Sequence, residues 1–141
     1  NRYIWCNIES ATRYLTQQYG EVYTITGVAF TGKKTKQLAE RVLVPSHFFK
    51  AVYIPATNQA GVYYAPNDES ERIEVISLDE LTAKVGIDVL PVLDRQTKAQ
   101  AFALPLKAGE SADLPDQPVE EPTWLLFVWA IIEWLLTQLQ A

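Results

Sequence analysis

The segment NRYIWCNIESATRYLTQQYG, residues 1–20, opens the chain and decides how its fold begins. Its buried-type side chains recur at intervals of three and four residues, which is the period of an α-helix with one apolar face. These side chains are Ile4, Ile8, Ala11 and Leu15. Gly20 follows at the place of a helix C-cap. The spacing therefore predicts a helix over residues 1–18 that packs through one stripe.

The next segments are rich in β-branched and aromatic residues, which is typical of strands. They are VYTITGVAF (22–30), ERVLVP (40–45), SHFFKAVYIP (46–55) and GVYYAP (61–66). Gly27 indicates a bulge or a close approach in the first strand. We expect the second and third segments to form a strand pair that is broken at Pro45. TGKKTK (31–36) and ATNQAG (56–61) are expected to be polar turns or loops.

A short second helix is predicted over SLDELTAKVG, residues 77–86. Ser77 and Glu80 have the spacing of a capping box, and Gly86 ends the helix. IDVLPVL, residues 87–93, is predicted to be a short extended segment. Together these segments predict an α+β domain over residues 1–106, in which a mixed sheet is flanked by helices.

The remainder of the chain has a different composition. Residues 107–123 are acidic and rich in Pro, which predicts a linker. Residues 124–141 are predicted to be an apolar helix, with Glu133 as the one charge between 124 and 136. This run is shorter than the roughly 20 residues that span a bilayer, yet Trp124 and Trp129 favour a membrane-associated helix. The alternative is an amphipathic helix that packs on a partner or on another part of the protein.

Composition and charge limit the possible functions. The chain has 141 residues, of which 48% are hydrophobic, and this suits one globular domain with a sizeable core. The lone Cys6 excludes an internal disulfide. The net charge is −5, but residues 1–50 carry seven Lys or Arg against three Glu. This half therefore remains compatible with a nucleic acid, although an ordinary mixed surface explains the charges equally well.

Polar residues recur every four positions along the opening helix, at Asn1, Glu9 and Arg13, with Trp5 between them. An amide oxygen suits Mg²⁺, a carboxylate can hold a water of its shell, and a guanidinium binds phosphate. Such a ridge could serve phosphodiester hydrolysis. The same spacing is also common on surface helices, where Glu9 and Arg13 would form an ordinary ion pair.

Three motifs occur in a distinctive order: N-x3-W-x3-E-x3-R (1–13), then T-G-x-x-F within VYTITGVAF, then V-P-x-x-F-x-K within VPSHFFKAV. In this order they resemble the DNA/RNA non-specific endonuclease family, the ββα-metal nucleases that include Serratia nuclease and mitochondrial endonuclease G. The similarity covers roughly residues 1–93. It implies the ββα-metal fold, with the opening helix as its α element. It also implies a Mg²⁺-dependent endonuclease that cleaves DNA and RNA with little sequence specificity.

The resemblance also implies roles for single residues. Asn1 corresponds to the metal ligand, Glu9 to the carboxylate that holds metal-bound water, and Arg13 to an arginine near the scissile phosphate. Trp5 corresponds to a packing position. Gly27, Pro45 and Lys50 correspond to structural or unassigned positions. Mg²⁺, or another divalent cation, is the implied cofactor.

The family's general-base His lies in a D-R-G-H segment upstream of the metal-binding Asn. The one His of this chain, His47, corresponds to a variable position instead. Because the chain begins with Asn and contains no Met, we expect residues 1–141 to be an N-terminally truncated part of the enzyme, inactive alone. The alternative function is a catalytically inactive relative that binds nucleic acid or has a structural role, with or without a membrane tether.

The partners suggested at this level are DNA and RNA, a membrane contacted through residues 124–136, and a second copy of the chain in a homodimer. The sequence favours a secreted, periplasmic or membrane-associated protein without deciding among them.

Overall fold

The computed structural model describes residues 2–32, 37–38 and 41–109. The described helices are α1 (Arg2–Tyr19), η1 (Pro55–Thr57), α2 (Leu78–Val85) and α3 (Arg95–Ala99). The described strands are β1 (Tyr23–Ala29), β2 (Gln37–Leu38), β3 (Val42–Leu43), β4 (His47–Ile54), β5 (Gln59–Pro66) and β6 (Glu74–Ile76). This combination of helix and sheet confirms the predicted α+β class.

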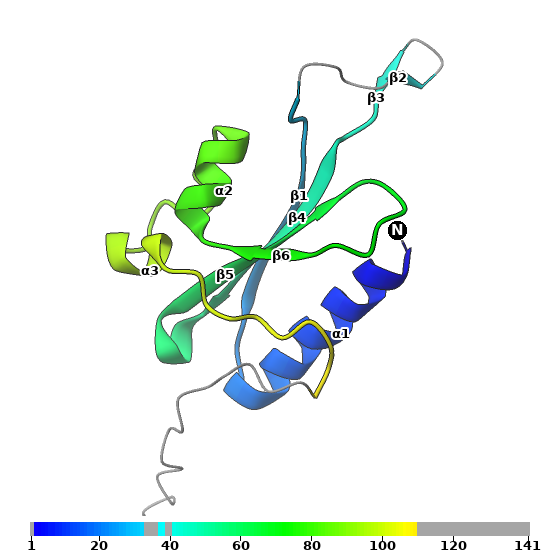
Figure 1. Ribbon diagram of the computed structural model, residues 1–141. Coiled ribbons are helices and arrows are strands. Elements are labelled where there is room, and N and C mark those ends of the chain that lie inside the picture. Colours follow the sequence, from blue (N-terminus) through cyan, green and yellow to red (C-terminus); the bar gives the residue numbers. More distant parts are fainter. Residues whose placement is uncertain (1, 33–36, 39–40, 110–141) are drawn as a thin grey trace, which may run out of the picture.

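Four strands form the central sheet in the order β1-β4-β5-β6, and β2 and β3 form a separate two-stranded arm (Figure 1). All described strand pairs are antiparallel, so the expectation of a mixed sheet was wrong. The reason lies in the connections. Parallel neighbours need a crossover of a dozen or more residues, usually a helix, whereas β4 is joined to β5 through the short helix η1.

The expected pairing of segments 40–45 and 46–55 was also wrong. β3 pairs with β2, whereas β4 pairs with β1 on one side and β5 on the other. Pro45 separates β3 from β4, because proline has no N–H to donate to a ladder. Its carbonyl instead accepts a hydrogen bond from the Asn67 side chain at 2.9 Å. The strand β3 therefore ends before Pro45, and the chain pairs with different strands before and after this residue.

The two faces of the sheet bury two separate clusters, and helices cover both faces (Figure 1). Side chains alternate between the faces along a strand. In β4, Val52 and Ile54 pack with α1, whereas Phe49 and Ala51 pack with α2. α1 therefore covers one face, and α2 with the segment that follows it covers the other.

The predicted stripe of α1 is buried, which confirms the helical period. Its four residues are at most 5% exposed: Ile4, Ile8, Ala11 and Leu15. Gly20 adopts a positive φ of 80° and its N–H donates to the carbonyl of Thr16 at 2.9 Å. This left-handed conformation costs glycine little, so the predicted C-cap is also confirmed.

The capping of α2 follows the prediction. The Ser77 side chain accepts from the Glu80 N–H at 3.2 Å, and the Glu80 carboxylate accepts from the Ser77 N–H at 2.8 Å. Gly86 ends the helix with a φ of 75°. The extended segment expected at 87–93 is absent among the described residues, which turn there and lead into α3.

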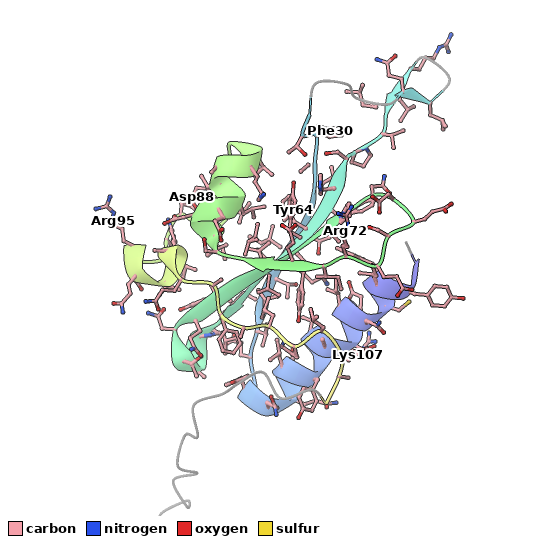
Figure 2. All side chains as sticks on the ribbon, in the orientation of Figure 1. Phe30, Tyr64, Arg72, Asp88, Arg95 and Lys107 are labelled. Carbon is pink, nitrogen blue, oxygen red and sulfur yellow. The ribbon has the colours of Figure 1, made fainter. Side chains whose placement is uncertain are left out.

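The predicted close approach at Gly27 is confirmed. Gly27 lies opposite Phe49 in the ladder, and a Cβ placed on it would come within 2.4 Å of the Phe49 ring. After α3 the chain crosses the α1 face of the sheet, where Phe102 and Leu104 join the core. Figure 2 shows the side chains of both layers on the two sides of the sheet.

The predicted linker is described only as far as residue 109, and the predicted apolar helix at 124–141 lies outside the described residues. Within residues 2–32, 37–38 and 41–109, no helix is both long enough and apolar enough to cross a membrane. The proposed membrane contact through 124–136 therefore remains a prediction.

Candidate active site on helix α1

The outward ridge of α1 brings two predicted site residues together. Glu9 and Arg13 line one surface depression of 370 Å³, together with Trp5, Cys6 and Ser10. They lie four positions apart, so they occupy neighbouring places on the same side of the helix. The predicted metal ligand, Asn1, lies outside the described residues.

Trp5 attaches this end of α1 to the sheet. Its ring lies 5.9 Å from the ring of Phe48 on β4, at an interplanar angle of 54°. Tilted aromatic pairs at this separation are attractive beyond the area that they bury. This contact agrees with the packing role that the sequence suggested for Trp5, and it orients the ridge that carries Glu9.

Glu9 forms the shortest polar contact of the ridge. Its Oε1 accepts a hydrogen bond from Nζ of Lys50 at 2.6 Å, across 41 residues of sequence. The two side chains differ in exposure: 6% for Lys50 and 40% for Glu9. The pair therefore runs from the dry core to the edge of the depression, with its carboxylate end in contact with water.

Arg13 is exposed, and its Nη2 donates to the hydroxyl of Ser10 at 3.4 Å, which is a weak contact. Among the described residues it forms no ion pair, so the alternative of a Glu9–Arg13 ion pair is not what the structure has. A guanidinium in this state has donors free for an anion that enters the depression.

His47 lies on the other face of the sheet. Its ring stacks on Tyr64, with 4.6 Å between the ring centroids, and Tyr64 belongs to the cluster beneath α2. Its Nδ1 lies within hydrogen-bond distance of the hydroxyls of Thr31 and Ser46, at 3.1 and 3.0 Å. Burial lowers the pKa of His47, and the charge of Lys84 lowers it further. The sheet separates this ring from Glu9, which makes it unsuitable as the base of a site on α1.

The donor set of the ridge fits a hydrated divalent cation better than a fully protein-bound one. The described residues contain no group of three or more His, Cys, Asp or Glu side chains that could hold a metal ion. Mg²⁺ does not require such a group, because it keeps several waters and binds proteins through few oxygen ligands. The half-exposed carboxylate of Glu9 offers a hard oxygen that can accept hydrogen bonds from such waters.

A second depression, of 210 Å³, lies between residues 58–60 and 97–103. Its polar groups are bonded to one another: Asn58 and Thr97 both donate to Asp94, at 2.9 and 2.8 Å. The backbone N–H of Thr97 and the side chain of Asn58 lower the pKa of Asp94 to about 2. These bonds cap α3 and hold it to the start of β5. The polar groups of this depression therefore have a structural role.

Comparisons with known proteins give the family of the chain. The sequence model of the DNA/RNA non-specific endonucleases matches residues 1–96, and the chain belongs to this family. A curated relative is Nuclease C1 of Cunninghamella echinulata var. echinulata, which is 33% identical over 79 residues. That alignment covers 48% of this chain and 31% of the relative, so the chain matches about a third of the relative's length. No solved structure gives a significant match.

Sequence reasoning left one member of the site unassigned. Lys50 was matched only to a structural or unassigned position, yet it is the partner of Glu9. The available signal was a charged residue inside SHFFKAVYIP, a strand that is otherwise apolar around it. No local pattern indicated that this strand would lie under α1, with Lys50 beneath Glu9.

Proposed function

We propose that the complete protein containing this chain is a divalent-cation-dependent endonuclease that hydrolyses phosphodiester bonds of DNA and RNA with little sequence specificity. The observation that carries the proposal is the shared depression of Glu9 and Arg13 on α1, inside the segment that matches the family. The name of the fungal relative, Nuclease C1, supports the same class of reaction.

In this proposal Glu9 orients water at the reaction centre. Its Oε1 is occupied by Lys50, and no hydrogen bond to Oε2 comes from the part of the chain that is described. A carboxylate with one occupied and one water-facing oxygen can accept a proton of a hydration water and fix its orientation. Glu9 thereby acts on water, with the nucleic acid held by other groups.

Arg13 binds the phosphate in this proposal. Its exposed guanidinium lies on the same ridge as Glu9 and can donate two parallel hydrogen bonds to phosphate oxygens. Positive charge at that place also stabilises the additional negative charge of the transition state. Contacts of this kind involve the backbone of the nucleic acid and no base edge, which accounts for a low sequence specificity.

The cation would be held by Asn1, with Glu9 contacting its hydration water, and α1 would be the helix of a ββα-metal fold. Mg²⁺, or a similar ion, supplies a Lewis acid that stabilises negative charge on the phosphoryl group. The general base is not among the described residues of the ridge, and His47 lies beyond the sheet. We therefore expect residues 1–141 alone not to cleave plasmid DNA.

The test uses the complete protein with supercoiled plasmid and single-stranded RNA, in Mg²⁺ and in EDTA. Glu9→Gln keeps the size of the side chain and removes its charge, and we expect kcat to fall about 10- to 100-fold. Glu21→Gln is the matched control, because Glu21 is an exposed carboxylate just beyond α1, and it should retain wild-type activity. Asn1→Ala should abolish metal-dependent cleavage with the fold retained.

Two results would contradict the proposal. Cleavage that is equal in Mg²⁺ and EDTA would exclude the metal, and wild-type activity in Glu9→Gln would exclude the carboxylate. Binding of DNA and RNA without cleavage by the complete protein would instead favour the alternative, a catalytically inactive nucleic-acid-binding relative. Arg13→Ala should raise KM and lower kcat, because it removes a phosphate contact.

A further inference from the structure

Lys50 occupies an unusual place for a charged residue. It lies in the middle of β4, a central strand, opposite Thr26 of β1 and Tyr63 of β5. It is 5% exposed, and its side chain points to the α1 face, as those of Val52 and Ile54 do. Lysine is almost never this buried unless its charge is paired.

One carboxylate and one aromatic ring surround the ammonium group. Nζ of Lys50 lies 2.6 Å from Oε1 of Glu9 and 5.9 Å from the centroid of the Trp5 ring. Both partners belong to the first half of α1, and both line the depression. Lys50 thus contacts Glu9 and Trp5, two of the residues that line the proposed site, from the sheet side of α1.

Stability alone gives little reason for this pair. Removing two charges from water costs as much as their attraction returns, and well-packed apolar residues often replace such pairs without loss. An apolar residue at position 50 would continue the core that Val52 and Ile54 form on this face. What an apolar residue cannot do is hold one oxygen of Glu9.

We propose that Lys50 is a positioning residue for the reaction: it fixes the carboxylate of Glu9 so that its second oxygen faces the water of the depression. This inference rests on the proposed function, because it assigns Glu9 the orientation of metal-bound water. Lys50 itself, beneath α1 and 5% exposed, does not contact the nucleic acid. It holds Glu9 from the rigid central strand, and a glutamate without that contact samples several rotamers.

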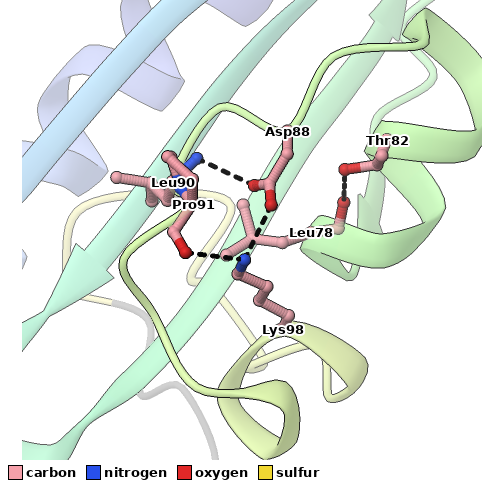
Figure 3. Close-up of polar contacts among 6 residues, drawn as sticks. All are labelled: Leu78, Thr82, Asp88, Leu90, Pro91 and Lys98. Atoms are coloured by element: carbon pink, nitrogen blue, oxygen red, sulfur yellow. Dashed lines mark hydrogen bonds and ion pairs between the residues drawn. The ribbon is translucent and has the colours of Figure 1, made fainter.

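The chain contains a matched control for this pair. Nζ of Lys98 lies 2.7 Å from Oδ2 of Asp88, and the two side chains are 14% and 39% exposed. Figure 3 shows this pair beside α2, where Lys98 also donates to the carbonyl of Pro91. Lys98→Met therefore removes an ion pair of similar length and burial that lies away from the depression.

The experiment compares Lys50→Met, Lys98→Met, Glu9→Gln and the double variant Lys50→Met/Glu9→Gln in the complete protein. Three quantities are measured: kcat and KM on plasmid DNA, the Kd of Mn²⁺ by electron paramagnetic resonance, and Tm. For Lys50→Met we expect a kcat about 10- to 100-fold lower, a KM within about twofold, and Mn²⁺ binding weakened by the same factor as in Glu9→Gln. Lys98→Met should change only Tm.

The double variant decides whether Lys50 acts through Glu9. If it does, the loss in kcat for the double variant equals that for Glu9→Gln, because the positioned group is already absent. Losses that multiply, or a Lys50→Met protein with wild-type kcat and Mn²⁺ affinity, would overturn the inference. Should Lys50→Met fail to fold, Lys50→Arg retains the buried charge with a different donor geometry, and it should show the same weakened Mn²⁺ binding.

The Mn²⁺ measurement separates this inference from the proposed function. A protein that does not cleave, but whose Mn²⁺ affinity falls equally in Lys50→Met and Glu9→Gln, would reject the nuclease activity and retain the positioning role. A protein that cleaves and requires Glu9, but whose kcat and Mn²⁺ affinity do not change in Lys50→Met, would retain the nuclease activity and reject the positioning role.

Discussion

The molecule contains two lysine–carboxylate pairs of nearly the same length, one on each side of the sheet. Lys50 and Glu9 are 2.6 Å apart, and Lys98 and Asp88 are 2.7 Å apart. In each pair the carboxylate is close to 40% exposed and the lysine is much more buried. Ion-pair geometry alone would therefore assign them the same role.

Their surroundings differ. Lys98 donates to Asp88 and to Pro91, and the second oxygen of Asp88 accepts the N–H of Leu90 at 3.2 Å (Figure 3). All of these groups lie between residues 88 and 98, so the pair closes a local loop. The Lys50–Glu9 pair instead joins a central strand to the opening helix, across 41 residues of sequence, and the Glu9 side chain is 40% exposed.

This difference extends to the whole of each face. On the α2 face a capped helix covers an apolar cluster. The α1 face departs from this pattern at Lys50, where a charge stands in a strand position that packing alone would leave apolar. Departures of this kind are expected where function constrains a fold, because the local rules otherwise act together. We infer that the α2 face contributes only to stability, whereas the α1 face buries a core cluster of its own and also carries the proposed site.

The largest expected effect concerns the α2 face. Leu81 is fully buried in the cluster beneath α2, so Leu81→Ala should lower the free energy of unfolding by about 2–5 kcal/mol. Leu38→Ala is the control, since Leu38 is 66% exposed and its loss should cost little. Urea unfolding measures both. The comparison of the faces would fail if Leu81→Ala lowered the activity per folded molecule as strongly as Glu9→Gln does.

A smaller effect is expected at the start of α2. Ser77→Ala removes the hydroxyl that accepts the Glu80 N–H, and it should cost about 1 kcal/mol. Ser77→Gly should cost only a few tenths of a kcal/mol, because glycine suits the cap conformation. Thermal unfolding of the two variants measures both losses. Equal losses would mean that the hydrogen bond, which both variants lack, accounts for the whole effect, and that the fit of glycine to the cap conformation contributes nothing.

The smallest effect is a dependence on pH that involves His47. Burial lowers its pKa below 6.5 in the folded state, so the unfolded chain binds the proton more readily between those two values. Stability should therefore fall as the pH decreases below about 6.5, and this slope should be weaker in His47→Gln. Lys98→Met should keep the slope. Urea titrations between pH 5 and 8 measure it, and an unchanged slope in His47→Gln would exclude His47 as its source.

Much of the fold could be predicted because the responsible signals are local. The stripe of α1, the Gly20 cap, the Ser77–Glu80 capping box and the close approach at Gly27 each depend on neighbours within a few residues or on the absence of a side chain. β6 and α3 were not predicted. They are three and five residues long, too short for a period to be recognised.

The candidate site could be predicted in part. The ridge of α1 follows from the helical period, and the family resemblance marked Glu9 and Arg13 on it. The strand partners of β3 and β4 could not be predicted, because pairing depends on which segments meet in space. Lys50 illustrates the same limit: a lysine in an apolar strand was visible, but its partner lies 41 residues away.

By itself, the sequence determined the opening helix, predicted over residues 1–18, the main strands, the caps of α2 and the family to which the chain belongs. Those properties arise from periods, turn residues and motifs that are read along the chain. Only the tertiary structure decided that the sheet is antiparallel, that His47 faces α2, and that Lys50 lies beneath Glu9. The physical reason is the alternation of a strand: shifting by one residue moves a side chain to the other face, and only the packed sheet selects the face.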